Sequence, residues 1–246
     1  MGKGEAAAFM PEIVHAHDWQ AALTPAYLHF AAGPKARAVM TVHNLAFQGQ
    51  YPASIFAQLK LPAAAYAING VEYYGGVGYL KAGLHYADAI TTVSPSYADE
   101  ITTPEDGMGL DGLLRLRRDR LTGIVNGIDT DIWNPASDTH LAQSYVPRNF
   151  IQRREANKRE IERRFGLDQD DGLLFCVVSR LTWQKGMDLL VQCLDQLVGL
   201  GARLALLGSG DAQLEADFGK AAARHKGRIG TVIGYDETVS HLLQGG

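Results

Sequence analysis

The residues best suited to chemistry are two cations, Arg180 and Lys185, within the polar stretch 179–186. This stretch follows the apolar run 173–178 and precedes the amphipathic segment 187–200. A buried strand that breaks into a polar turn and then a helix places the turn at the carboxyl edge of a parallel sheet, where open α/β folds bind ligands. Free N–H groups at the start of the helix also favour anions. The pattern therefore predicts a site for a diphosphate.

Two further polar clusters follow predicted strands in the first half of the chain. One contains His17 and Asp18, and the other contains His43 and Asn44. Successive strands that end in histidine-rich turns indicate a working site, although a structural histidine and a helix-capping aspartate explain the first cluster equally well. A metal is a third alternative, because His15 and His17 form a His-x-His pair. No convincing carboxylate set accompanies His43, so we expect no metal.

Asn126 and Tyr235 are also candidates for ligand contact. Asn126 precedes Gly127, and because Asn-Gly is a strong turn signal we predict a tight turn there, whether or not Asn126 also touches a ligand. Tyr235 lies just beyond the predicted strand 229–233, at the same sheet edge as the cationic turn. Its ring is suited to stacking on a base, and an exposed loop tyrosine is the simpler alternative.

A glycine-rich turn adds Gly208, Gly210 and Asp211 to the candidates, because it lies between a predicted strand and a predicted helix. It is similar to the phosphate-binding turn of dinucleotide-binding folds but lacks the third glycine, and Leu214 stands near that position. A plain strand-to-helix turn explains the pattern as well.

The composition is that of an ordinary globular protein. The chain has 246 residues, of which 46% are apolar and 20% charged, and a net charge of −4. This charge gives no reason to expect nucleic acid or an anionic membrane as a partner. No apolar run is long enough to span a bilayer, and the first residues lack the apolar core of a signal peptide, so we expect a cytoplasmic protein.

The cysteines and an arginine-rich run allow predictions about burial and solvent exposure. Cys176 lies in a predicted strand and Cys193 in a predicted helix, and we expect both to be buried thiols without a disulfide. The arginine-rich run 115–120 is interpreted as the solvated face of a helix or loop.

Segments typical of strands and helices alternate along both halves of the chain, which predicts parallel sheets built from βαβ units. Ser94 is interpreted as the N-cap of a short helix, and residues 102–120 show no clear period. The predicted strands are 12–16, 36–42, 89–93, 173–178, 203–207 and 229–233. The predicted helices are 20–30, 80–86, 95–100, 149–165, 186–199, 212–225 and one that opens near residue 237.

The alternation predicts an α/β protein with two Rossmann-like, doubly wound domains that meet at a cleft. We place one domain at residues 1–121 and the other at 122–246, with a linker helix at about 149–165. The chain stops within a predicted helix and opens on a strand typical of a sheet interior. We therefore expect an internal part of a longer protein, with both domains incomplete.

Many segments together resemble the bacterial glycogen synthases and plant starch synthases, a family of retaining glucosyltransferases that use ADP-glucose. They occur in family order and cover nearly the whole chain. The resemblance implies a GT-B fold, with acceptor glucan held mainly by the first domain and the nucleotide sugar by the second. The segments are HAHDW (15–19), TVHNLAFQG (41–49), LKAGLHYAD (80–88), TTVSPSYADEI (91–101), GIVNGIDTDIWNP (123–135), SRLTWQKG (179–186), LALLGSGD (204–211) and IGYDE (233–237).

On the nucleotide side, the resemblance implies that Arg180 and Lys185 hold the donor diphosphate and stabilise charge on departing ADP. Tyr235 matches the aromatic residue at the adenine, and residues 208–211 match a turn that lines the nucleotide site. On the sugar side, His17 matches the histidine that contacts the donor glucose near the reacting carbon. Asn126 matches a sugar-contacting residue at the domain crossing.

The reaction that the resemblance implies needs neither a metal nor a cofactor, because two preorganised cations can stabilise the leaving phosphate. No obvious carboxylate nucleophile is present, which favours attack by the acceptor hydroxyl on the same face, with the departing phosphate as base. Domain closure would exclude water and limit hydrolysis.

Two family motifs lie outside this chain, Lys-Thr-Gly-Gly-Leu upstream and Glu-Pro-x-Gly-Leu downstream. Both hold the donor in the family, so we expect this polypeptide alone to have little or no synthase activity and low stability. Two alternatives remain. One is a non-catalytic nucleotide- or glucan-binding remnant, and the other is a different GT-B nucleotide-sugar glycosyltransferase.

Overall fold

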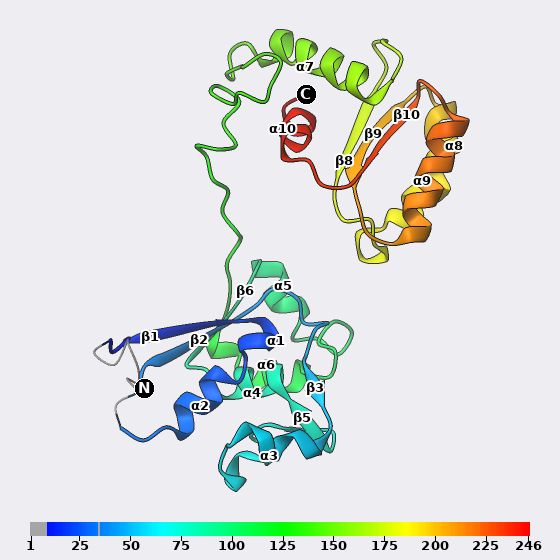
Figure 1. Cartoon of the computed structure of the whole chain (residues 1–246). Coiled ribbons are helices and arrows are strands. Elements are labelled where there is room, and N and C mark those ends of the chain that lie inside the picture. The colour runs from blue at the N-terminus through cyan, green and yellow to red at the C-terminus, as the bar shows by residue number, and fades with distance from the viewer. Residues whose placement is uncertain (1–8, 34) are drawn as a thin grey trace. The chain divides into compact units, whose positions relative to one another are not determined.

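A computed structural model describes residues 9–33 and 35–246. The chain divides into two compact units, Met1–Gly127 and Ile128–Gly246 (Figure 1). The division falls a little after the one expected at 121–122, because the short strand β7 (Leu121–Gly123) pairs with β6 (Ala89–Thr92) of the first unit.

The first unit is built on a parallel sheet in the order β1-β2-β6-β7, with β1 at Ile13–His17 and β2 at Arg37–Val42. These strands confirm the predicted alternation. Parallel strands require crossover connections, and helices supply them here. The helices are α1 (Asp18–Ala21), α2 (Thr24–Phe30), α4 (Tyr79–Tyr86), α5 (Pro95–Glu100) and α6 (Asp111–Leu116).

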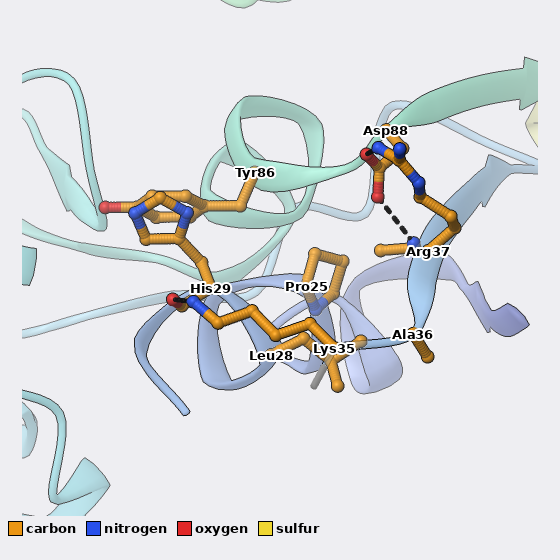
Figure 2. A pocket seen from close by; sticks show the side chains of 9 residues that line it. Pro25, Leu28, His29, Lys35, Ala36, Arg37, Tyr86 and Asp88 are labelled. Atoms are coloured by element: carbon orange, nitrogen blue, oxygen red, sulfur yellow. Dashed lines mark hydrogen bonds and ion pairs between the residues drawn. The ribbon is translucent and has the colours of Figure 1, made fainter. Parts of the chain in front are cut away.

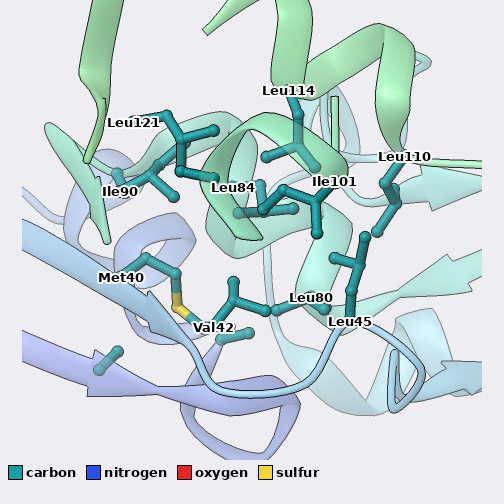
Figure 3. Packing of buried hydrophobic residues seen from close by; sticks show 14 residues of the cluster. Met40, Val42, Leu45, Leu80, Leu84, Ile90, Ile101, Leu110, Leu114 and Leu121 are labelled. Carbon is teal, nitrogen blue, oxygen red and sulfur yellow. The ribbon is translucent and has the colours of Figure 1, made fainter. Parts of the chain in front are cut away.

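Alternating apolar residues of the sheet and the facing side of α4 form the core of the first unit (Figure 3). Met40 of β2 and Ile90 of β6 are fully buried, as are Leu80 and Leu84 of α4. Leu80 and Leu84 are four positions apart, which places them on one face of the helix. This packing fixes the carboxyl ends of β1 and β2, where the histidines lie.

A small antiparallel sheet, in the order β3-β5-β4, lies between β2 and β6 in the sequence. Its strands are β3 (Gln50–Tyr51), β4 (Glu72–Tyr73) and β5 (Gly76–Gly78), and the short helix α3 (Phe56–Leu59) lies between β3 and β4. Single-turn 3₁₀ helices complete this region at Ala53–Ile55 and Ala63–Ala65.

The second unit has a parallel sheet in the order β10-β9-β8. Its strands are β8 (Leu174–Val178), β9 (Arg203–Gly208) and β10 (Ile229–Ile233). Its helices are α7 (Phe150–Phe165), α8 (Met187–Gly199), α9 (Ala212–Arg224) and α10 (Glu237–Gly245). These elements confirm the predicted second series, including the end of α7 at Gly166, which has a φ of 63°.

Side chains of β9 alternate between two apolar clusters, as expected for a strand buried on both faces. Leu204 and Leu206 pack in the cluster that contains α8 and α9 residues. Ala205 and Leu207 pack in the cluster that contains α7 and α10 residues. The helices therefore cover both faces of this sheet, and the loops after the strands form its carboxyl edge.

A buried arginine ties the elements of the second unit together. The Arg203 side chain in β9 is 0% exposed and forms an ion pair with Glu162 of α7, which is also 0% exposed. Its guanidinium donates further hydrogen bonds to the backbone carbonyls of Asp168, Asp170 and Gly172. The loop between α7 and β8 is thereby fastened to the centre of the sheet.

Three sequence expectations are wrong in detail. The predicted helix 20–30 is broken into α1 and α2, because Pro25 in the first turn of α2 lacks the N–H that a continuous helix requires. The strand 173–178 is not buried: in the described part of the chain β8 lies at the sheet edge, and Phe175 is 47% exposed. For the same reason Cys176 is exposed, as is Cys193 on α8, although both are free thiols as expected.

The arginine-rich run 115–120 is also only partly solvated. Arg117 is half-buried, and its guanidinium donates hydrogen bonds to the carbonyls of His85 and Ala87 at the end of α4. These carbonyls have no partner within their own helix, so Arg117 acts as a C-terminal cap.

Candidate nucleotide and sugar sites

The cationic turn after β8 is held in place by its neighbour. Leu181 is 0% exposed and forms an isolated parallel bridge with Gly210, in the turn after β9. Arg180 and Lys185 flank this anchor and are exposed. No ion pair or side-chain hydrogen bond of either cation occurs within residues 9–33 and 35–246. The buried Leu181 thus holds two exposed positive charges in place.

The start of α8 lies next to these cations. Lys185 ends a single-turn 3₁₀ helix, Trp183–Lys185, and Gly186 follows with a φ of 67° as the N-cap of α8. The left-handed conformation favours glycine at this position. Gly186 makes no side-chain cap, so the first N–H groups of α8 add to the positive potential of the turn.

The two glycines of the turn after β9 are required by close packing. A Cβ at Gly208 would lie 2.0 Å from the Ser179 carbonyl oxygen, and one at Gly210 would lie 2.3 Å from the Leu181 carbonyl oxygen. Asp211 is the N-cap of α9, where Oδ1 accepts hydrogen bonds from the N–H groups of Gln213 and Leu214 at 2.9 and 3.1 Å. The turn therefore has a structural role whatever it binds.

A cavity of about 240 Å³ brings three predicted residues together at the carboxyl edge of the second sheet. Arg180, Gly208 and Tyr235 all line it, together with Ser240 of α10. The Gly234 N–H donates to the Gly208 carbonyl at 3.0 Å, which holds the Tyr235 loop against the glycine turn. Neither Lys185 nor Asp211 lines this cavity.

Tyr235 is 83% exposed, so its ring is open to stacking. Its hydroxyl donates to Glu237 Oε2 at 3.3 Å, and the negative charge of Glu237 raises the pKa of the phenol. The phenol is therefore neutral at physiological pH, which suits a ring that stacks beside a phosphate-bearing ligand.

In the first unit, the structure brings His17 and His43 together. β1 pairs in parallel with β2 in a register that sets His17 opposite Thr41, so His43 follows only two residues beyond the partner of His17. His17 Nδ1 lies 3.1 Å from His43 Nε2, within hydrogen-bonding distance. Asp18, with a φ of 53°, accepts the His43 backbone N–H on Oδ1 at 2.7 Å.

Asn44 closes the turn after β2, and Asn126 lies in the stretch that follows β7. Asn44 Oδ1 accepts the Ala46 N–H at 2.9 Å, which is an Asx turn. Asn126 is exposed in an extended stretch with no turn at Asn126-Gly127, so the predicted tight turn is wrong. An Asn-Gly pair makes a hairpin turn when paired strands flank it, and here the chain instead runs from one unit to the next.

The sequence indicated no functional role for His15, nor for Thr41 and Thr91, which form a chain of hydrogen bonds with it. His15 Nε2 lies 2.6 Å from Thr41 Oγ1, which lies 2.5 Å from Thr91 Oγ1. The His15 ring is 4.2 Å from the His17 ring. Burial, with the charges of His17 and His43, lowers the pKa of His15, so His15 is neutral at physiological pH. The i, i+2 spacing of His15 and His17 signals one strand face and could have revealed this contact.

A second cavity, of about 320 Å³, lies at the opposite end of β2 (Figure 2). Its charged groups are already engaged: Arg37 pairs with Asp88 at 2.8 Å, and Lys35 donates to the His29 carbonyl. The rings of His29 and Tyr86 lie 4.7 Å apart at its wall. Because its charged side chains already have partners within the protein, we assign this cavity at the amino ends of the strands a structural role and not a ligand-binding one.

The described residues also bear on metal binding and on membrane insertion. Within residues 9–33 and 35–246, no group of three or more His, Cys, Asp or Glu side chains is arranged to hold a metal ion. Over the same residues, every helix is too short or too polar to cross a lipid bilayer.

Comparison with known proteins places these sites in a family context. Residues 2–116 match the family described as "Starch synthase catalytic domain". A glycogen synthase of Mesorhizobium japonicum is 60% identical over 99% of this chain and 50% of its own length. A glycogen synthase of Rhodopseudomonas palustris is 56% identical over 100% of this chain and 51% of its own length. The chain spans about half the length of the curated relatives it matches.

A solved structure matches as well. The catalytic domain of starch synthase IV from Arabidopsis thaliana, bound to ADP and acarbose, superposes with a TM-score of 0.89 at 30% identity. The match covers 97% of this chain and 51% of that one, and it confirms the GT-B fold expected from the sequence. Along nearly its whole length, and with the predicted α/β elements in place, the chain is therefore similar to about half of the length of bacterial glycogen synthases and of a plant starch synthase.

Proposed function

We propose that this chain forms part of a glycogen or starch synthase. The enzyme transfers glucose from ADP-glucose to the 4-hydroxyl at the non-reducing end of an α-1,4-glucan, with retention, in the cytoplasm. The substrates are the nucleotide sugar and the glucan, and the reaction uses no metal or other cofactor. The family relationship and the cavity at the carboxyl edge of the second sheet support this proposal.

The observation that carries the proposal is that Arg180, Gly208 and Tyr235 line one cavity. A nucleoside diphosphate presents a flat base and a doubly charged tail, and these residues supply matching chemistry. The Tyr235 ring stacks on adenine, and the Arg180 guanidinium binds phosphate oxygens with charge-assisted hydrogen bonds. The glycine turn lets the backbone approach the nucleotide closely. Lys185 and the start of α8 add positive charge for the distal phosphate, and Asp211 holds the turn.

Transfer builds negative charge on the departing β-phosphate, and the glucose becomes oxocarbenium-like. Arg180 and Lys185 are fixed before the reaction, so they stabilise the leaving group without reorganisation. The C1–O bond to the phosphate breaks as the acceptor hydroxyl forms a bond to C1 on the same face. The hydroxyl proton passes to the departing phosphate oxygen. The products are ADP and a glucan longer by one glucose.

The first unit contributes the sugar contacts in this proposal. His17 contacts the donor glucose near the reacting carbon, and Asn126 contacts a sugar at the crossing between the units. Asp18, His43 and Asn44 shape the edge on which the glucan is held, through the turn that they form after β2.

Isothermal titration calorimetry of the chain with ADP tests the nucleotide site. Arg180→Ala should weaken ADP binding by roughly 10- to 100-fold, the loss expected for a hydrogen bond to a charged group. Lys220→Ala, which removes the same charge from the outer face of α9, is the matched control and should leave the affinity unchanged. Equal ADP affinity for wild type and Arg180→Ala would place the diphosphate elsewhere.

Glucosyl transfer to glycogen, measured on the full-length enzyme, separates the remaining alternatives. Transfer from ADP-glucose in preference to UDP-glucose, with an α-linked product, supports the synthase. A preference for UDP-glucose supports another GT-B glycosyltransferase. Binding of ADP or maltooligosaccharide with no transfer supports the non-catalytic remnant.

A further inference from the structure

The contact between His17 and His43 restricts where their protons lie. His17 Nδ1 and His43 Nε2 are 3.1 Å apart, and the two rings are stacked with centroids 5.4 Å apart. A hydrogen bond across this distance needs one N–H and one lone pair, so the facing nitrogens share a single proton. The nitrogen that carries it sets the tautomer of both rings.

Two arrangements satisfy the bond when both rings are neutral. If His43 Nε2–H donates to His17 Nδ1, both rings adopt the Nε2–H tautomer, the commoner form of free neutral histidine. If His17 Nδ1–H donates to His43 Nε2, both rings must adopt the rarer Nδ1–H tautomer. The first arrangement avoids two unfavourable tautomers, and it leaves an N–H at His17 Nε2.

We propose that His43 is a positioning residue, which donates its Nε2–H to His17 Nδ1 and thereby keeps a hydrogen-bond donor at His17 Nε2. This inference rests on the proposed function for its catalytic meaning. It assigns His43 a task distinct from contact with the glucan, because its Nε2 is engaged by His17.

The surrounding groups support this arrangement. Asp18 of α1 binds the His43 backbone N–H through Oδ1, which fixes the start of the His43 side chain. The His15 ring of β1 lies 4.2 Å from the His17 ring, with its Nε2 engaged by Thr41 of β2. Tyr97 of α5 holds the loop that contains His43, because its hydroxyl accepts the Leu45 N–H at 3.0 Å. His17 thus has two imidazole neighbours, one on β1 and one just after the end of β2.

A hydrogen-bond donor at a fixed ring nitrogen of His17 is useful in the proposed reaction. The Nε2–H can donate to a hydroxyl of the donor glucose. His43 therefore secures the position of the donor atom.

Long-range ¹H–¹⁵N correlation spectra of the histidine-labelled chain test the proposal directly at neutral pH. We expect His17 Nε2 to be protonated and His17 Nδ1 to have the shift of an unprotonated, hydrogen-bond-accepting nitrogen. His43→Gln places an amide N–H near the position of Nε2 and should keep this pattern. His43→Ala should move both His17 shifts towards those of a free tautomer mixture. His140→Ala, in the second unit, is the control.

A protonated Nδ1 on His17 in the wild-type chain would overturn the proposal, as would a His17 signal that is the same in wild type and His43→Ala. In glucosyl transfer by the full-length enzyme, kcat should fall roughly five- to tenfold in His43→Ala, the effect of one hydrogen bond, and should recover in His43→Gln. Loss of kcat in both variants would overturn the tautomer role. The spectra need no turnover, so failure of the proposed function is detected separately, by absent transfer in the full-length wild type.

Discussion

Leu181 and Gly210 form a parallel bridge that joins the cationic turn after β8 to the glycine turn after β9. The Asp211 N–H donates to the Leu181 carbonyl at 2.8 Å, and the Leu181 N–H donates to the Ser209 carbonyl at 3.0 Å. The buried Leu181 side chain sits between these bonds. Arg180 and the glycine turn are therefore positioned as one piece, so a change in either turn displaces the other.

Gly210→Ala should destabilise the second unit, because the new methyl group would lie 2.3 Å from the Leu181 carbonyl oxygen. We expect the free energy of unfolding to fall by about 1–3 kcal/mol, the usual cost of overpacking. Urea unfolding followed by circular dichroism measures the loss, and hydrogen exchange of β9 amides localises it.

Gly219→Ala is the matched control for this substitution. Gly219 lies within α9, and a Cβ there meets nothing within 4 Å. Alanine should stabilise the helix by about 0.5–1 kcal/mol. If Gly210→Ala were as stable as Gly219→Ala, the close approach of the two turns would be refuted.

Asp211 should stabilise the second unit through the hydrogen bonds that its side-chain oxygen accepts, and not through its negative charge. Asp211→Asn keeps an acceptor for the Gln213 and Leu214 N–H groups, and should unfold at nearly the wild-type urea concentration. Asp211→Ala removes the cap and should lower the free energy of unfolding by about 0.5–2 kcal/mol. Equal losses in the two variants would show that the carboxylate charge is essential.

Asp88 should make the first unit less stable in acid. The Ala38 N–H, bonded to Oδ2, lowers the pKa of this carboxyl group, and Arg37 lowers it further. A depressed folded-state pKa means that the stabilisation is fully present above about pH 4, the ordinary pKa of aspartate, and is lost as the pH falls through the folded value.

Comparison with Asp88→Asn isolates this effect from the other carboxylates. The difference in unfolding free energy between wild type and the variant should shrink as the pH is lowered from neutrality towards the depressed pKa. A difference that stays constant with pH would contradict the ionic role of Asp88.

Cys193 should react with maleimide faster than Cys176, although both residues are exposed. The sulfur of Cys176 faces α10, 3.5 Å from the Leu243 carbonyl oxygen, and burial of the thiol raises its pKa. The thiolate is the nucleophile, so a raised pKa slows the reaction. Mass spectrometry of the labelled chain should show one rapid addition, which Cys193→Ser abolishes. Equal labelling rates at the two residues would contradict this expectation.

The sequence predicted the elements well where local patterns decide them. The strand 229–233 matches β10, and Ser94 caps α5 by accepting the Tyr97 N–H, as expected. Apolar periods and capping residues are local signals, so the elements predicted from them agree with the folded structure. Helix α6 was missed because its six residues are too few to show a period.

Contacts that depend on strand register were only partly predictable. The sequence placed His17 and His43 at one sheet edge, but their hydrogen bond requires the β1–β2 register, which no local pattern reveals. Cys176 was misplaced because the hydrophobicity of β8 does not show which face or edge is covered. At Asn126, a local turn signal was overridden by the path of the chain between two compact units.

Arg203 has a consequence for how the second unit folds. Its partners lie in α7 and in the loop 166–172, so that they precede it by 31 to 41 positions in the sequence. Burying the guanidinium before they arrive would cost several kcal/mol, because a desolvated cation would have no counter-charge. Formation of β9 is therefore coupled to the docking of α7, and we expect these elements to open together as a single cooperative block.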